Sequence, residues 1–503
     1  MYLAHGFPPA SGSGAVRSLA FARYLPMYGW RPLVLTPGEG WAANADARLG
    51  AQVPGWLEVI RTASLEPRPV GPPAPSATPK IAGGRHADVS CDGAERHTER
   101  HAVEKRSQAA ADRPEERHTG GAVAGDGSEK RHGGSAVAGD RPEERHVRRA
   151  VRLAALVKRH IASPNGLARR VRRHGGHLRR FPDAHLGWLP FAVWAGLRLA
   201  PRVDVLYSSS GPFTSHLVGL VLHVLTRRPW VAELRDGWYR WNRAIFPDYP
   251  AWRGPLEGWL EGQVIRRAAR VVCVTDRMAD AFRRQYPDLP AEHFSVVPNG
   301  FDPGAHVAVD AHPDHGRGGA FTVVHAGALY YGRSIQPFLH AAARLAQEDA
   351  DFARAFRLDL VGSLDQTARA EVAESPIAAR VVCHGQLDHP STLARERAAD
   401  LLLLVANTTL GAQATVPGKL FEYLASGRPV LAIAPRESTT ADVLARTGGG
   451  WLADGADPEA VYRQLRAAFS RERVAVDPRQ LAPFDRRRLA GELARVLDAA
   501  LFA

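Results

Sequence analysis

The sequence predicts an α/β protein with two Rossmann-like, doubly wound domains, and three observations lead to this prediction. Short apolar runs alternate with segments of helical periodicity in two separate series. A glycine-rich loop follows the first predicted strand of each series. A long stretch without aromatic residues interrupts the first series. Such alternation is typical of parallel sheets that helices cover on both faces.

The first series predicts an N-terminal domain formed by residues 1–61 and 181–300. Its loop at residues 5–14 leads into a helix near 15–27, and Gly12 and Gly14 would let the backbone approach a ligand closely. A simple tight turn explains the same glycines, so both interpretations stay open. The first strand is short, and we expect the true start codon to lie upstream of Met1. The predicted strands are Met1–His5, Pro32–Thr36, Leu57–Arg61, Val203–Ser208, Trp230–Leu234 and Val271–Thr275.

Residues 62–146 predict a disordered insertion. The segment lacks aromatic residues and contains a duplication, in which the sequence of Asp112–His118 recurs as Asp140–His146. Such a composition cannot bury enough apolar surface to fold. Its histidines are spaced too widely and loosely to indicate a metal site.

Residues 147–180 form a basic segment with eleven Arg or Lys residues and no Asp or Glu, and they supply most of the net charge of +13. Apolar residues from Val151 to Ile161 interleave with the cations, which predicts an amphipathic helix. That pattern favours an anionic membrane surface as its partner. A helix docked on its own protein is an alternative. Nucleic acid is a weaker one, because no aromatic residues are interleaved for base stacking.

The second series predicts a C-terminal domain at residues 301–485, followed by a crossing helix at 486–503. Arg333 stands at a helix start after the loop that begins at Gly327, where it is placed to meet phosphate. The predicted strands are Phe321–Ala326, Arg357–Val361, Val381–His384, Asp400–Val405, Arg428–Ile433 and Gly450–Ala453.

Residues 406–436 are the most informative stretch. After a buried strand, Val416 and Gly418 open a short helix that carries Lys419 and Glu422. The free N–H groups of its first turn and the Lys419 cation suit an anion, and Glu422 can accept from sugar hydroxyls. A nucleotide sugar fits this chemistry, although a plain connection between Rossmann elements would look similar.

The run Pro417-x-Lys-x-x-Glu-Tyr-Leu-Ala-x-Gly-x-Pro-Val-Leu431 resembles the donor-site helix of family 4 glycosyltransferases. These are retaining enzymes of the GT-B fold, and the resemblance is strongest to the branch that makes bacterial surface polysaccharides. The loop and helix that end near Gly29-Trp30, and the Pro298-Asn-Gly-x-Asp302 run, resemble the same family. The resemblance implies two Rossmann-like domains that face a central cleft.

The resemblance also implies site residues. Arg333, Lys419 and backbone N–H groups would neutralise the leaving diphosphate without an essential metal, and Glu422 would hold the ribose. The transfer would be front-face and retaining, without an enzyme nucleophile. The predicted catalytic residues are Asp236 and His216, which would orient the acceptor or relay its proton. The predicted donor-binding residues are Gly12, Gly14, Arg333, Val416, Gly418, Lys419 and Glu422, and no metal ligand is predicted.

One departure from the family and three alternative interpretations of single residues stay open. The wider family has a glutamate eight positions before Glu422, where this chain has Ala414, and this puts the donor sugar in doubt. Asp236 could instead cap a helix and His216 could instead be a satisfied helix-start residue. Arg333 could be a surface cation.

The sequence therefore predicts a glycosyltransferase that moves a sugar from a nucleoside diphosphate donor, UDP-linked, onto a lipid-linked glycan or polysaccharide precursor. We expect no cofactor and no nucleic-acid partner. We expect a cytoplasmic enzyme that is peripheral on the inner face of the plasma membrane, because no apolar run approaches a bilayer span. The alternatives are a GT-B sugar-nucleotide epimerase and a non-catalytic basic scaffold that binds membrane or nucleic acid.

Overall fold

The structure is a computed structural model that describes residues 1–41, 45–66, 181–240, 243, 249–306, 319–330, 332–408, 411–470 and 474–502. The basic segment at 147–180 and nearly all of the predicted insertion lie outside these residues. The described chain runs on to Glu66, five residues into the range predicted as insertion, although the last strand before it ends at Thr62. The reason is local: Thr62 still belongs to a strand, and Glu66 makes side-chain contacts of its own.

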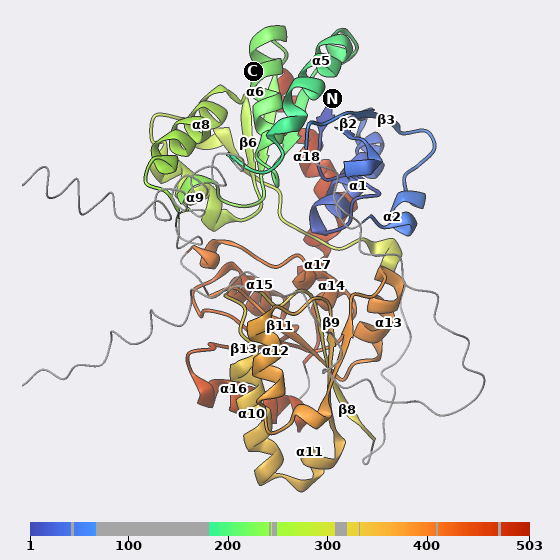
Figure 1. Ribbon diagram of the computed structural model, residues 1–503, viewed down its shortest axis with the longest axis vertical. Coiled ribbons are helices and arrows are strands. Elements are labelled where there is room, and N and C mark those ends of the chain that lie inside the picture. Colours follow the sequence, from blue (N-terminus) through green and yellow to red (C-terminus); the bar gives the residue numbers. More distant parts are fainter. Residues whose placement is uncertain are drawn as a thin grey trace, which may run out of the picture. The chain divides into compact units, whose positions relative to one another are not determined.

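Seven parallel strands of the described residues form the first sheet, in the order β3-β2-β1-β4-β5-β6-β7. These strands are β1 (Tyr2–Leu3), β2 (Leu33–Pro37), β3 (Glu58–Thr62), β4 (Leu206–Ser209), β5 (Trp230–Leu234), β6 (Arg270–Cys273) and β7 (Phe294–Val296). Most of their residues are apolar and buried on both faces, as expected for a parallel sheet between helical layers. We call this sheet and its helices the first lobe (Figure 1).

The helices of the first lobe pack on this sheet and contribute to two apolar clusters. One cluster includes Trp188, Trp230 and Trp238, and the other includes Phe7, Phe21 and Val34. The helices are α1 (Ser13–Tyr24), α2 (Ala47–Ala51), α5 (Leu189–Leu199), α6 (Thr214–Thr226), α8 (Arg253–Arg267) and α9 (Asp276–Gln285).

Six parallel strands form the second sheet, in the order β10-β9-β8-β11-β12-β13 within the described residues. They are β8 (Phe321–Ala326), β9 (Phe356–Val361), β10 (Val381–Gly385), β11 (Leu401–Val405), β12 (Val430–Ile433) and β13 (Gly450–Ala453). The helices of this second lobe are α10 (Gln336–Glu348), α11 (Ala350–Ala355), α12 (Gln366–Ala373), α13 (His389–Ala398), α14 (Lys419–Ala425), α15 (Thr439–Thr447), α16 (Pro458–Phe469) and α17 (Pro478–Leu481).

The last helix, α18 (Arg486–Leu501), returns to the first lobe. Its apolar face, which includes Leu489, Leu493 and Leu497, belongs to the same cluster as Leu19 and Phe21 of α1. Figure 1 shows α18 beside α1. Helix α18 lies within the range 486–503 predicted as a crossing helix, and its apolar residues complete the core of the domain that begins the chain.

The two doubly wound α/β domains of a GT-B fold are thus confirmed. Predicted and observed strand boundaries agree to within about three residues, with the starts of β1 and β4 trimmed. Among the described residues, no helix is both long and apolar enough to cross a bilayer.

Candidate functional site

Each sheet has one point where its connections turn to opposite sides, and open α/β sheets bind ligands beyond the carboxyl ends of the strands at such a point. In the first sheet it lies between β1 and β4, and in the second between β8 and β11. The predicted site residues follow these strands or their neighbours. The two edges are therefore described in turn.

The glycine-rich loop after β1 is shaped by two glycines with different tasks. Gly12 has φ of 102°, a conformation that favours glycine because other residues have a Cβ atom. Gly14 makes room for a cation: a Cβ atom there would lie 2.3 Å from Nη1 of Arg235. A hydrogen bond positions the Arg235 side chain, because its Nε donates to the carbonyl oxygen of Ser210 at 2.5 Å. The loop therefore carries a fixed, half-exposed guanidinium on its surface.

The two predicted catalytic residues lie in contrasting places. Asp236 follows Arg235 at the end of β5 and is exposed, so it is open to a substrate. His216 has no exposed surface, and its Nδ1 is hydrogen-bonded to Oγ of Ser208 at 2.8 Å. Burial, the largest cause, lowers the pKa of His216 to about 3. A neutral, enclosed imidazole is suited to positioning β4 and α6, and Asp236 is the residue of the two that a substrate can reach.

A buried ion pair fixes α1 against the strands behind this edge. Nη2 of Arg17 lies 2.7 Å from Oε1 of Glu233, and Oγ of Ser209 donates to the other carboxylate oxygen at 2.5 Å. Arg17 also donates to the carbonyl oxygen of Pro298 at 2.6 Å. Burial opposes ionisation of Glu233, but Arg17 and Arg235 outweigh it, and the pKa of Glu233 stays below its usual range. The pair therefore orients the helix that starts directly after the glycine-rich loop.

In the second lobe, two predicted cations flank the loop after β8. A Cβ atom on Gly327 would lie 3.6 Å from Cδ of Lys419, and Nη1 of Arg333 donates to the carbonyl oxygen of Ala328 at 3.3 Å. His325 lies beneath them, with Nε2 buried and without a hydrogen-bond partner in the described residues. Burial, with smaller effects of Lys419 and Arg333, lowers the pKa of His325 to about 4. The two cations and a neutral imidazole therefore meet at one strand end.

A buried carboxyl group lies behind Lys419. Oε1 of Glu396, on α13, is 3.9 Å from Nζ of Lys419, and neither carboxylate oxygen has a hydrogen-bond partner in the described chain. Burial raises the pKa of Glu396 to about 7, against the opposing effect of Lys419. The charge next to Lys419 therefore changes near neutral pH.

The remaining predicted donor residues surround the start of α14. Glu422 is largely buried, with Oε1 3.9 Å from Nη2 of Arg486 at the start of α18. Val416 is buried in the apolar cluster under the helix. A Cβ atom on Gly418 would lie 4.0 Å from Cβ of Ser13, next to the glycine-rich loop of the first lobe. The structure thus brings Gly418, Lys419 and Glu422 together on one short helix, with Arg333 on the loop after β8.

Sequence reasoning missed Arg235, His325 and Glu396 as functional candidates. A histidine within an otherwise apolar strand, as in Phe321–Ala326, was a usable signal. Glu396 carried none, because a glutamate on a helix with charged neighbours normally faces solvent. Sequence reasoning also missed the group formed by His5, Glu66 and His185, which is described below.

Comparison with solved structures gives distant likenesses. A crystal structure of Anabaena HepE in complex with UDP has 17% identity and a TM-score of 0.43, and the match covers 62% of this chain and 79% of that one. Sucrose-phosphate synthase from Thermosynechococcus elongatus has 18% identity and a TM-score of 0.45, with 63% and 76% covered. The UDP-forming trehalose-phosphate synthase from Burkholderia vietnamiensis has 14% identity and a TM-score of 0.44, with 63% and 73% covered. No curated protein sequence matches the chain.

Two family models match in succession. A glycosyl transferase 4-like domain matches residues 131–300, and the glycosyl transferases group 1 model matches residues 320–471. The matched ranges together span well over half of the 503 residues; the first contains β4–β7 of the first lobe, and the second contains β8–β13 of the second lobe. The chain therefore belongs to the GT-B glycosyltransferases that these two models describe.

Proposed function

We propose that this protein transfers a sugar from a UDP-linked donor to a lipid-linked glycan or polysaccharide precursor, with retention at the anomeric carbon. The observation that carries the proposal is the placement of Lys419 and Arg333 on either side of the loop after β8. Two cations at the carboxyl end of a central strand suit a diphosphate. UDP is the nucleotide that the sequence resemblance predicts.

In this proposal the cations act on the leaving group. The bond between the anomeric carbon and the diphosphate oxygen breaks, the acceptor oxygen bonds to the same face, and negative charge grows on the departing UDP. Lys419 and Arg333 stabilise that charge without an essential metal. Glu422 accepts from the ribose hydroxyls. Asp236 orients the acceptor hydroxyl and takes up its proton.

A donor screen by thermal shift tests the proposed donor site. We expect UDP and UDP-sugars to stabilise the full-length protein more than GDP does, because ligands that bind only the folded state raise its stability. The stabilisation should be lost in Arg333→Ala and in Glu422→Ala. Arg354→Ala is the matched control, since Arg354 is an exposed arginine on α11 of the same lobe. A folded protein that no nucleotide stabilises would instead favour the basic scaffold.

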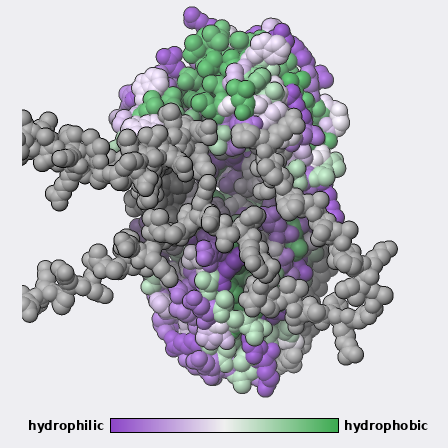
Figure 2. Space-filling model, viewed as in Figure 1, coloured by the Kyte–Doolittle hydropathy of each residue, from purple (hydrophilic) through white to green (hydrophobic). Residues whose placement is uncertain are grey.

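We also propose that the enzyme works at the inner face of the plasma membrane. Support comes from apolar side chains that lie exposed on α5 and α6: Trp194, Leu197, Val224 and Leu225. Figure 2 shows apolar surface in the region of these helices. Arg198 stacks on Trp194, 3.5 Å from its ring centre, and Arg227 and Arg228 follow α6. Aromatic and cationic residues of this kind suit the interface of an anionic bilayer.

Co-sedimentation with vesicles tests the membrane proposal. The full-length protein should bind vesicles that contain anionic lipid and not neutral vesicles, and binding should weaken with salt. A Trp194→Ser, Leu225→Ser variant should bind less tightly than the wild type. Equal sedimentation of this variant and the wild type would remove α5 and α6 from the proposed membrane-binding surface.

A further inference from the structure

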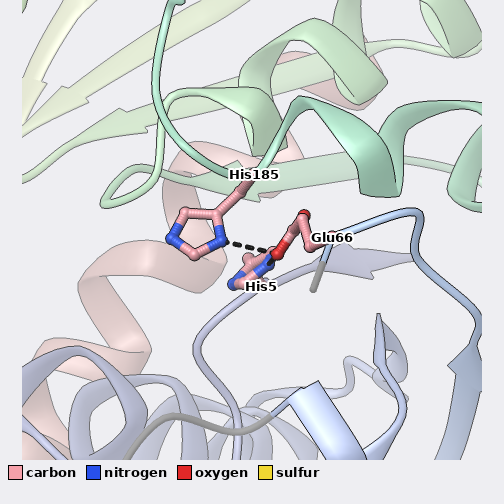
Figure 3. A group of neighbouring side chains, drawn as sticks. All are labelled: His5, Glu66 and His185. Atoms are coloured by element: carbon pink, nitrogen blue, oxygen red, sulfur yellow. Dashed lines mark hydrogen bonds and ion pairs between the residues drawn. The ribbon is translucent and has the colours of Figure 1, made fainter. Parts of the chain in front are cut away.

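Three side chains from distant parts of the sequence meet at the carboxyl edge of the first sheet (Figure 3). His5 follows β1, Glu66 follows β3, and His185 precedes α5. One nitrogen or oxygen atom from each lies within 4.8 Å of the others. Oε2 of Glu66 is 2.9 Å from Nδ1 of His185 and 3.8 Å from Nε2 of His5. The carboxylate therefore stands between two imidazoles.

Two of the three side chains are almost fully enclosed by the protein. The side chains of His5 and Glu66 are only 9% and 11% exposed, and Nε2 of His5 has no hydrogen-bond partner among the described residues. Burial lowers the pKa of His5, whereas at His185 the effects of Glu66 and Asp183 outweigh burial and raise the pKa. Burial alone would raise the pKa of Glu66, but its hydrogen bond with His185 and its interaction with His5 outweigh burial and bring the pKa to about 2.

The surrounding chain holds these side chains in place. Oγ of Ser64 donates to Oε1 of Glu66 at 2.9 Å, which leaves Oε2 to face the histidines. The backbone N–H of His185 donates to Oδ1 of Asp183 at 2.9 Å. A Cβ atom on Gly187 would lie 3.0 Å from the backbone nitrogen of Glu66, so glycine allows the two segments to approach. Outer contacts of this kind are what orient ligands in metal sites.

We propose that His5, Glu66 and His185 bind a divalent transition-metal ion of the zinc class. Two imidazoles and one carboxylate are a ligand set that zinc accepts, with a fourth position left for an oxygen ligand. Bonds of about 2.0–2.1 Å in a tetrahedron place ligand atoms roughly 3.3 Å apart. The 2.9 Å and 3.8 Å separations lie on either side of that value. His185 is the most exposed of the three, at 36%, so the fourth position opens on its side.

The three proposed metal ligands do not include Arg333, Lys419 or Glu422, although His5 begins the loop that carries Gly12 and Gly14. All three ligands belong to the first lobe, whereas Arg333, Lys419 and Glu422 belong to the second. The ion would therefore lie on the first lobe, and the diphosphate would still be neutralised by cationic side chains of the second. Metal binding and nucleotide binding can be measured separately, so failure of one proposal leaves the other standing.

The test is a metal titration of the full-length protein after removal of bound metal with a chelator. Zn²⁺ binding is followed by calorimetry, and Co²⁺ binding by the visible absorption that indicates tetrahedral coordination. The first variant is His185→Ala, because His185 is more exposed than His5 and its loss disturbs the core less. The second variant is Glu66→Gln, because glutamine has nearly the same shape as glutamate. His340→Ala is the control, since His340 is exposed on α10 of the second lobe.

A second control removes competing histidines. Residues 67–146 contain six histidines: His86, His97, His101, His118, His132 and His146. A variant in which all six are changed to Asn separates metal binding by these histidines from metal binding at the proposed site.

We expect one tight equivalent of Zn²⁺ in the wild type, in His340→Ala and in the six-Asn variant. The affinity should fall in His185→Ala and in Glu66→Gln by more than the roughly tenfold to hundredfold that loss of a supporting residue costs. Far-UV circular dichroism confirms that each variant is folded. The proposal is overturned if no tight equivalent binds, if both site variants keep it, or if the six-Asn variant loses it.

Discussion

Nζ of Lys419 lies 3.9 Å from Oε1 of Glu396, whose side chain has no exposed surface. The predicted phosphate-binding cation thus has a buried carboxyl group behind it. That carboxyl group has a pKa of about 7, so its charge is sensitive to pH in the range where the protein would work. Two predictions concern this pair.

The stability of the protein should depend on pH through Glu396. The pKa of Glu396 is about 7 in the folded state and 4.5 as its usual value, which we take for the unfolded state. Between these two pH values the folded state therefore binds more protons than the unfolded state does. The contribution of Glu396 to stability is therefore fully present below pH 4.5 and falls as pH rises to 7. Glu396→Gln, which stays neutral, should be more stable than the wild type at pH 8, by up to about 3 kcal/mol. The variant and the wild type should have similar free energies of unfolding near pH 4.5. Chemical denaturation at pH 4.5 and pH 8 measures both values. A gain of the same size at both pH values would contradict this origin.

The same substitution should change donor binding, a prediction that rests on the proposed donor site. Ionised Glu396 attracts Lys419 and repels a diphosphate, so Glu396→Gln should bind UDP about fivefold more tightly at pH 8, which corresponds to roughly 1 kcal/mol. At pH 6 the wild type is largely protonated, and the difference should shrink. Calorimetric titration with UDP measures the affinities of the wild type and of Glu396→Gln at pH 8 and at pH 6. A matched Lys419→Gln variant should lose affinity at both pH values.

Two glycine-to-alanine changes should differ in their effects because of what each Cβ would meet. At Gly14 it meets the tip of the Arg235 side chain at 2.3 Å, which can move. At Gly300 it meets the backbone oxygen of Phe484 at 2.0 Å, which cannot move without shifting the start of α18. We expect Gly14→Ala to cost less than about 1 kcal/mol of unfolding free energy and Gly300→Ala about 3 kcal/mol. Gly14→Ala should nevertheless lower the transfer rate, because Arg235 must leave the loop. Equal unfolding midpoints for the two variants would refute the distinction.

The buried pair of Arg17 and Glu233 should show strong coupling. Arg17→Met removes the cation in direct contact with buried Glu233 and leaves only the weaker effect of Arg235, which should cost about 3–5 kcal/mol. Adding Glu233→Gln should recover part of that loss, because the buried negative charge is then removed. Arg354→Ala, at a 77% exposed side chain, should change stability by about 1 kcal/mol at most. Denaturation curves of the two single variants and the double variant form the cycle. Additive losses would mean that the pair is not coupled.

The sequence by itself determined the two α/β lobes and the order of their elements. Runs such as Leu401–Val405 are apolar at every position, and a strand buried on both faces suits a run of this length. Lys419 and Glu422 were found because a local rule, helical spacing after a Gly-containing loop, places them on one short helix. Local periodicity carries this information because it depends on neighbouring residues alone.

Only the tertiary structure decided which side chains meet and which are enclosed. Nothing near His216 indicated complete burial, and nothing near Glu396 indicated a carboxyl group behind Lys419. His5, Glu66 and His185 are separated by 61 and 119 residues, so no spacing pattern could join them. Strands β1 and β3 and the start of α5 bring them to one edge of the sheet. Burial and long-range contact are properties of the packed chain, and they set the pKa values and ligand sets on which the proposed chemistry depends.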